Sequence, residues 1–113
     1  MMTIEKLVDF GADVKEGLGR CMNNEGFYLT LVNMIRDEKN FGLLQEAIDA
    51  HDYDHAFEYA HSLKGVLGNL SLTPLYEPMV EITELLRARE EADYPELLKD
   101  FFEKKAEFDA LFE

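Results

Sequence analysis

Apolar residues recur at helical spacing along almost the whole chain, and this periodicity restricts the fold to helices. Alternating runs of β-branched residues closed by Asn-Gly or Asp-Gly turns, the usual signature of β-hairpins, are missing. The first two predicted helices are short and lie near residues 3–9 and 13–21. Two further helices are predicted from apolar positions three and four residues apart: one capped by Asn24 with Phe27, Leu31, Met34 and Ile35, and one with Phe41, Leu44, Ala47 and Ile48.

Capping residues and prolines set the expected limits of the last three helices. Asp52 is the predicted N-cap of a helix that runs to about residue 69. Thr73 is the predicted N-cap of the next helix, with Pro74 at its first position and Pro78 expected to weaken or kink its second turn. Pro95 opens a last helix whose apolar positions are Leu97, Leu98, Phe101, Phe102 and Phe108.

The connections between these helices are short, so consecutive helices should lie antiparallel. The chain has 113 residues, which suits one domain over residues 1–113. Its apolar fraction of 47% is enough to fill one core. The expected fold is all-α: an antiparallel four-helix bundle with one or two short additional N-terminal helices.

The charge balance restricts the partners. With 24 acidic and 11 basic residues, the net charge of -13 disfavours nucleic acids and anionic membranes, both of which attract basic surfaces. No apolar run is long enough to span a bilayer and no signal segment opens the chain, so we expect a cytoplasmic protein. The chain is also expected to be a monomer. The lone Cys21 agrees with a reducing compartment and is expected to be a small buried apolar residue.

The stretch AHSLKGVLGNL, residues 60–70, contains a histidine followed by glycines four and seven residues later. A glycine within a helix costs about 1 kcal/mol relative to alanine, so two of them in one helix need a reason. On a helix with about 100° per residue, Phe57, Lys64, Gly65 and Gly68 lie within about 60° of His61. The apolar positions lie on the opposite side, so His61 should project from the surface, beside one cation and two positions without side chains.

This arrangement favours phosphoryl chemistry at His61. A neutral imidazole is a good nucleophile near neutral pH, and Lys64 could offset the charge of an attached phosphoryl group. The glycines would allow another protein to approach the ring closely. The chain has neither a P-loop nor a glycine-rich nucleotide-binding motif, so the phosphoryl donor should be a partner.

The stretch AHSLKGVLGNLSL resembles the HxLKG signature of histidine-containing phosphotransfer (HPt) domains, which relay phosphoryl groups to and from receiver-domain aspartates. The resemblance implies that His61 is the phosphoacceptor, that Lys64 supports the phosphate, and that Gly65 and Gly68 admit the receiver domain. Phe57 is a candidate apolar contact for that domain. The implied partners are response-regulator receiver domains or a hybrid histidine kinase, with Mg²⁺ held by the receiver domain and no cofactor in this chain.

Two positions depart from the family pattern. Many members have a glycine where this chain has Ser71, a difference expected to matter only if the backbone there has positive φ. Many members also present a Gln or Glu from the next helix to the histidine ring. The matching position here is Thr83, whose short hydroxyl side chain is the predicted ring-orienting group.

Three alternatives compete with this interpretation. His51 and His55, with Asp52 or Asp54, suggest a metal site, although capping by Asp52 would place His51 outside the helix. A histidine-kinase dimerisation domain also carries a phosphorylated histidine on a helical bundle, but it usually follows that histidine with an acidic residue and a nearby proline. A non-catalytic helical adaptor is the remaining possibility. Enzymatic activity is not expected, because no Ser-His-Asp or Cys-His arrangement is evident.

Overall fold

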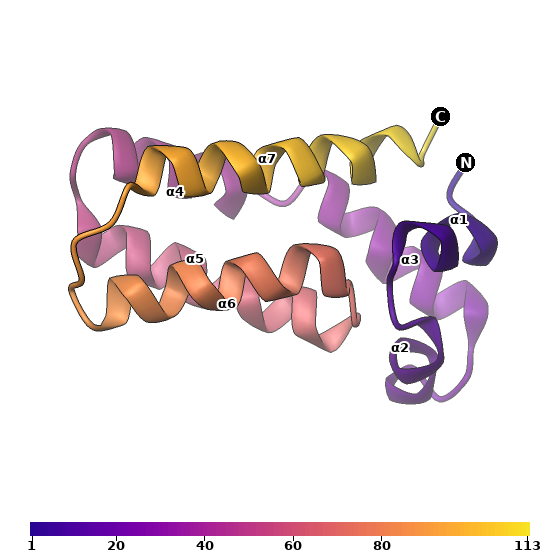
Figure 1. The fold of residues 1–113 in the computed structure, drawn as a ribbon. Helices are drawn as coiled ribbons and strands as arrows, with labels where there is room; N and C mark the ends of the chain where they lie inside the picture. The colour runs from indigo at the N-terminus through magenta and orange to yellow at the C-terminus, as the bar shows by residue number, and fades with distance from the viewer.

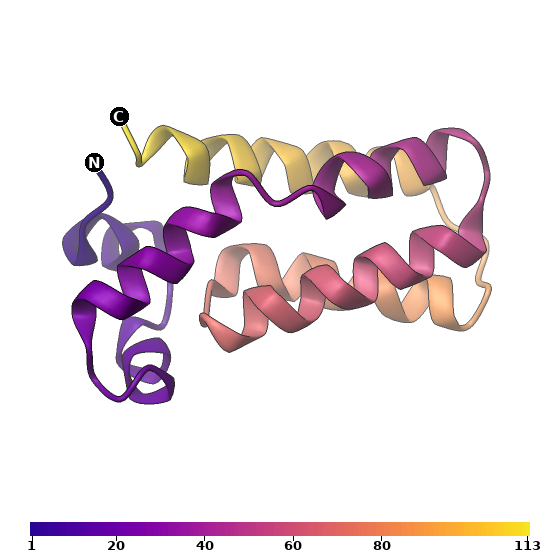
Figure 2. The ribbon, with the colours of Figure 1, turned by 180° about the vertical axis from the view of Figure 1, so that it is seen from behind.

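The computed structural model describes all 113 residues, which form seven α-helices and no strand (Figure 1, Figure 2). The helices are α1 (Ile4–Phe10), α2 (Val14–Arg20), α3 (Glu25–Arg36), α4 (Asn40–Asp49), α5 (Tyr53–Asn69), α6 (Thr73–Arg87) and α7 (Tyr94–Ala110). None of them is long and apolar enough to cross a lipid bilayer.

The last four helices form the predicted bundle. Helix α4 packs against α5, α5 against α6, α6 against α7, and α7 returns to α4, which closes a ring of four. Consecutive helices in this ring run antiparallel, and the layer of α4 and α7 lies over the layer of α5 and α6 (Figure 1, Figure 2). The expected all-α bundle is confirmed; two short helices, α1 and α2, precede it together with the longer α3. These helices, α1, α2 and α3, gather at one end of the bundle.

Side-chain caps begin most of the helices. The predicted caps Asn24 and Asp52 are confirmed, since their side chains accept hydrogen bonds from the backbone N–H of Phe27 and His55. Thr3, Asp13 and Asp93 cap α1, α2 and α7 in the same way. Local sequence therefore defines the starts of these helices.

Helix α6 begins differently from the prediction. Leu72 occupies the N-cap position without a side-chain hydrogen bond, and Thr73 is the first helical residue. The Thr73 hydroxyl donates instead to the carbonyl oxygen of Ser71 at 3.4 Å. Pro74 thus lies one position deeper than predicted, and the helix continues through Pro78 to Arg87. Pro74 is tolerated because it lies in the first turn, where N–H groups have no intrahelical partner, whereas Pro78 lies inside the helix and leaves one backbone hydrogen bond of the second turn unmade.

A core of 26 buried apolar residues runs through the bundle and into the N-terminal helices. Tyr28, Val32 and Ile35 are the residues that α3 contributes to it. Two of the apolar positions predicted for α3 lie outside this core: Phe27 is 51% exposed and Met34 is 65% exposed. The buried stripe of α3 is therefore rotated away from the one predicted. Cys21 is buried and unpaired, as expected.

Candidate functional site

His61 lies in the middle of α5 and projects to solvent. The side of α5 that faces the bundle consists of fully buried residues, Ala56, Ala60, Leu63 and Leu67. The His61 imidazole is exposed and makes no hydrogen bond within the chain, and its nearest aromatic neighbour is the Phe57 ring, with centroids 5.7 Å apart. Both ring nitrogens are therefore open to an incoming group.

Lys64 lies one turn beyond His61 and is held by the neighbouring helix. Its Nζ is 3.8 Å from Oε1 of Glu84 on α6, and its side chain is only 24% exposed. Glu84 also pairs with Arg87, whose Nε lies 3.2 Å from the other carboxylate oxygen. Lys64 is thus a partly ordered cation on the side of α5 that carries His61.

Replacing Lys64 with alanine is expected to shorten the lifetime of a phosphoryl group on His61 by up to roughly fivefold, because a partly exposed charge pair contributes at most about 1 kcal/mol. The free energy of unfolding should change little, since the Lys64–Glu84 pair is itself partly exposed. The measurement is the decay of labelled protein, with Lys99→Ala on α7 as the control. An unchanged lifetime would remove Lys64 from the site.

The two glycines of the motif are in different environments. A Cβ atom at Gly65 would meet no other atom within 4 Å, so the surface there is open. A Cβ atom at Gly68 would lie 2.7 Å from Cε1 of Tyr76 on α6. The surface at Gly65 is therefore open, whereas the space at Gly68 is occupied by the chain's own Tyr76 ring, so Gly68 does not clear the surface as expected.

Phe57 lies on α5 one turn before His61 and contacts Arg87 of α6. It is half-buried, and the guanidinium of Arg87 lies 4.9 Å from the centre of its ring. Phe57 therefore contacts α6 through this cation–π interaction, while part of its ring remains exposed beside His61. Its proposed contact with a receiver domain stays a prediction.

Thr83 does not lie where a ring-orienting group is needed. Its side chain is fully buried, and its hydroxyl donates to the carbonyl oxygen of Met79 at 2.6 Å. The prediction that Thr83 orients His61 is corrected by this placement, because the hydroxyl is bonded within the core. The next residue, Glu84, is exposed and reaches α5 through Lys64. The buried spacing of Met79, Ile82, Thr83 and Leu86 is the sequence signal that assigns Thr83 to the core.

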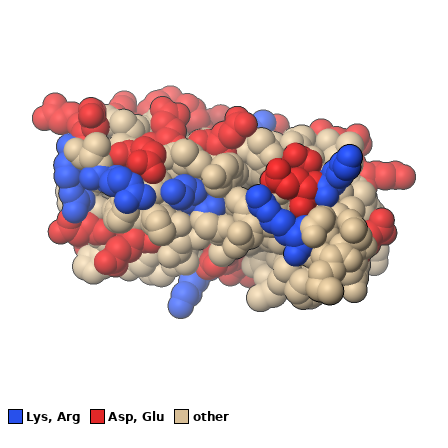
Figure 3. Space-filling view, turned by 90° about the horizontal axis from the view of Figure 1, so that it is seen from below, with Lys and Arg blue, Asp and Glu red and all other residues tan.

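A polar hollow of about 410 Å³ lies beside Gly65 and extends to α2. Arg20 of α2 lines it, pairs with Glu16 at 3.3 Å and donates to the carbonyl oxygen of Gly68. Sequence reasoning did not identify Arg20 or Glu16, because they are about fifty residues away from the motif along the chain. Lys and Arg side chains form a row across the α5–α6 face, with acidic side chains on both sides (Figure 3). On this side of the protein Arg20 pairs with Glu16, and Lys64 and Arg87 pair with Glu84, so the cations of the row have carboxylate partners within the chain.

Ser71, at the end of the motif, has a left-handed backbone with φ of 54°. Because φ is positive at this position, serine is expected to be less favourable here than the glycine of many family members. Its hydroxyl compensates by donating to Oε1 of Glu16 at 2.8 Å, and its carbonyl oxygen accepts from the N–H of Asp13 at 2.9 Å. Ser71 thus ties α2 to the end of α5.

Two substitutions at Ser71 separate these contributions. Ser71→Ala loses the bond to Glu16 and keeps the strained backbone, whereas Ser71→Gly loses the same bond and relieves the strain. We expect the glycine variant to be more stable than the alanine variant by about 1 kcal/mol, the usual penalty for a Cβ atom in this conformation. Urea unfolding of both variants measures the difference, and an alanine variant at least as stable as the glycine variant would contradict it.

The alternative metal site is not assembled. His51 lies outside α5 with φ of 55°, and its Nδ1 is 3.0 Å from the Tyr53 hydroxyl. Nδ1 of His55 is 2.7 Å from Oδ2 of Asp52. No three His, Cys, Asp or Glu side chains converge in a ligand-like group.

The Asp52–His55 pair predicts a pH dependence of stability. The backbone and side chain of His55 donate hydrogen bonds to Asp52 and lower the pKa of its carboxyl below 3.8, while the carboxylate raises the pKa of His55 above 6.5. The Asp52 contribution is lost as pH falls through its lowered pKa, and the His55 contribution is lost as pH rises through its raised pKa. The pair should therefore stabilise the fold most between these two limits.

Unfolding of the wild type and of His55→Gln across this range tests the pH dependence. The stability difference between the two proteins should be greatest between about pH 4 and pH 6.5, where both groups of the wild type are charged. A stability difference between the wild type and His55→Gln that is constant with pH would contradict the predicted role of the Asp52–His55 pair.

Comparison with known families agrees with this geometry. The family described as Hpt domain matches residues 37–113, which include α4 to α7 and the whole motif helix. Neither the curated proteins nor the solved structures gave a match. Since the family match covers more than half of the chain, this protein belongs to the Hpt domain family, the histidine phosphotransfer domains of phosphorelay signalling.

Proposed function

We propose that this protein accepts a phosphoryl group on His61 from the aspartyl phosphate of one receiver domain and passes it to the aspartate of another. The observation that carries the proposal is the His61 ring itself, which is exposed, unbonded and bordered by the open surface at Gly65. Membership in the Hpt domain family supports the class of reaction. The roles of individual residues are part of this proposal.

In the forward step, a neutral ring nitrogen of His61 attacks the phosphorus of the aspartyl phosphate. The bond from phosphorus to the aspartate oxygen breaks, and the carboxylate remains on the receiver domain. The ring keeps the phosphoryl group after losing the proton on its other nitrogen to solvent. The return step reverses these events with a different receiver domain. Mg²⁺ belongs to the acidic pocket of the receiver domain in this scheme.

The surface around His61 suits such a partner. Lys64 lies one turn from the ring and can offset the added negative charge. The Lys and Arg side chains on the α5–α6 face could pair with an acidic receiver pocket in exchange for Glu16 and Glu84, although the whole chain carries a charge of -13 (Figure 3). Rates of transfer should therefore fall as salt concentration rises.

The proposal assigns no kinase activity to the chain, whose sequence has neither of the common nucleotide-binding motifs. Phosphate would enter from a receiver domain, either free-standing or part of a hybrid histidine kinase. We also place this relay in the cytoplasm, the compartment expected from the sequence.

Incubation with purified receiver domains carrying labelled aspartyl phosphate tests the proposal. The expected result is rapid transfer to this protein of a label that is labile to acid and stable to base, as a phosphohistidine is. A second, unphosphorylated receiver domain should then remove the label. If no receiver domain of the source organism transfers a phosphoryl group to or from this protein, the proposal is wrong and the chain is a non-catalytic helical adaptor.

A further inference from the structure

Glu84 of α6 pairs with two cations at the same time. Its Oε1 atom is 3.8 Å from Nζ of Lys64 on α5, and its Oε2 atom is 3.2 Å from Nε of Arg87 on its own helix. The Arg87 nitrogen donates a hydrogen bond to the carboxylate, whereas the Lys64 contact is too long for one. Lys64 is therefore the more weakly held of the two cations.

Lys64 also lies one helical turn from His61, so a phosphoryl group on the ring would compete with Glu84 for it. A phosphoryl group has three strong acceptor oxygens and a charge of about −2 at neutral pH, whereas the Glu84 carboxylate has a single charge. The ammonium group of lysine ends a flexible four-carbon chain and has three donors. Lys64 can therefore turn from α6 towards a phosphoryl group without movement of the backbone.

Arg87 allows Glu84 to release Lys64 at little cost. The Arg87 guanidinium also lies 4.9 Å from the centre of the Phe57 ring on α5, which holds it in place. The carboxylate therefore keeps one cation after Lys64 leaves. The side chains of Glu84 and Arg87 are 53% and 49% exposed, so water solvates the oxygen that Lys64 vacates. The Lys64–Glu84 pair can thus open without leaving a buried charge.

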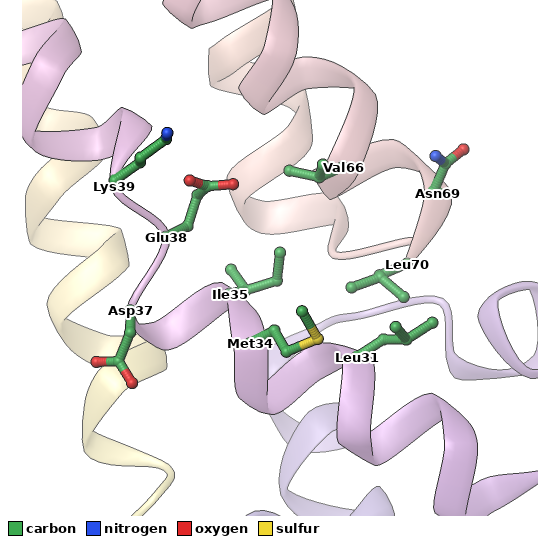
Figure 4. A pocket seen from close by; sticks show the side chains of 9 residues that line it. All are labelled: Leu31, Met34, Ile35, Asp37, Glu38, Lys39, Val66, Asn69 and Leu70. Atoms are coloured by element: carbon green, nitrogen blue, oxygen red, sulfur yellow. The ribbon is translucent and has the colours of Figure 1, made fainter.

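The surface on another side of α5 is different in character. A hollow of about 470 Å³ between α3 and α5 is lined largely by apolar side chains, among them Val66 and Leu70 of α5 (Figure 4). These two residues lie about 140° and 180° from His61 around the helix, so the hollow faces away from the imidazole. Its charged residues, 37–39, belong to the connection between α3 and α4. The ion pair that reaches the His61 side of α5 therefore comes from α6 and not from α3.

We propose that Glu84 holds Lys64 while His61 is unmodified and competes with the phosphoryl group for Lys64 once His61 is phosphorylated. Glu84 thereby sets the lifetime of the phosphohistidine, an inference that rests on the proposed phosphorylation of His61. Competition weakens the support that Lys64 gives, so Glu84 shortens the time for which the ring keeps its phosphoryl group. A group held less firmly passes more readily to the next receiver domain. Glu84 is a positioning residue, because it acts through Lys64.

The decay of protein phosphorylated with labelled phosphoramidate tests the proposal without a receiver domain. A neutral ring nitrogen of His61 attacks the phosphorus, the phosphorus–nitrogen bond of the reagent breaks, and ammonia leaves with the proton that the ring gives up. In the decay, water attacks the phosphorus, the bond to the ring breaks, and the ring regains a proton as inorganic phosphate leaves. Glu84→Gln should lengthen the half-life by up to about fivefold, since an exposed charge pair contributes at most about 1 kcal/mol.

Lys64→Ala and Glu58→Gln separate competition for Lys64 from simple repulsion. In the Lys64→Ala background, Glu84→Gln should change the half-life less than about twofold, because no lysine is left to release. Glu58 is the matched control, since it is exposed on α5 one turn before His61 and forms no ion pair. Any effect of Glu58→Gln is direct repulsion and should be the same with and without Lys64.

Two further measurements exclude a purely structural effect of Glu84→Gln. Urea unfolding of each variant checks the fold, and the lengthened half-life should return towards that of the wild type as salt concentration rises, because exposed charges are screened.

Two kinds of result would count against the account, and they are distinguishable. A half-life that Glu84→Gln leaves unchanged or shortens, or lengthens equally without Lys64, would overturn the role of Glu84 and leave the proposed function standing, because His61 would still carry the label. If phosphoramidate does not label His61 of the wild type, the proposed function is overturned and the role of Glu84 with it.

Discussion

Replacing His61 with glutamine is expected to abolish phosphoryl transfer to this protein. Glutamine keeps a polar side chain of similar reach, but its amide nitrogen is not a nucleophile. The His61 side chain is exposed and makes no hydrogen bond within the chain, so the free energy of unfolding should change by no more than about 0.5 kcal/mol. Transfer from a labelled receiver domain measures the first effect, and urea unfolding measures the second.

The other two histidines provide matched controls. His51→Gln and His55→Gln should be phosphorylated at the rate of the wild type, because neither residue lies on the motif surface. His55→Gln should lose some stability through the Asp52 contact, which shows that a change in folding alone does not reduce transfer. Label retained by His61→Gln would contradict the proposed phosphoacceptor.

Replacing Gly65 with glutamine should slow transfer at least about tenfold, which corresponds to about 1.4 kcal/mol of lost docking free energy. A side chain at this position enters space that is empty in the free protein and that the partner would occupy. The same change should raise the free energy of unfolding by up to about 1 kcal/mol, because glutamine is a better helix former than glycine. Reduced transfer with increased stability is a combination that damage to the fold does not produce.

Gly68→Ala is the comparison for this experiment. Its Cβ atom would collide with the Tyr76 ring, so we expect a loss of about 1–3 kcal/mol of stability. Shortening the neighbour in the double variant with Tyr76→Ala should make the added Cβ atom harmless. If Gly65→Gln instead destabilises the fold, or leaves the transfer rate unchanged, Gly65 does not provide clearance for a partner.

The fold was largely predictable because its signals are local. Caps such as Asn24 and Asp52 form hydrogen bonds with N–H groups three residues away, so the sequence alone places them. The exposure of His61 follows in the same way from apolar positions on the other side of the helix, of which Ala56, Leu63 and Leu70 are buried whereas Tyr59 and Val66 are only half-buried. These inferences need no knowledge of how helices pack.

The details that depend on packing were not predictable in the same way. The space beside Gly68 is occupied by Tyr76 of the next helix, and helical projection of α5 alone cannot show that contact. Counting from the motif places Thr83 at the position of the ring-orienting residue, whereas its burial depends on which stripe of α6 faces the core. Arg20 reaches the motif only because α2 folds against the end of α5. Each of these features depends on contacts between different helices, which the sequence of one helix does not reveal.

Mapping the phosphoryl group by mass spectrometry is the most direct test of the central claim. The wild-type protein would be phosphorylated by a receiver domain with Mg²⁺ and then digested and analysed at alkaline pH, where phosphohistidine survives. The expected result is one modified residue, His61, in a peptide that contains the motif. A phosphoryl group on His51, on His55 or on any residue other than His61 would contradict the account.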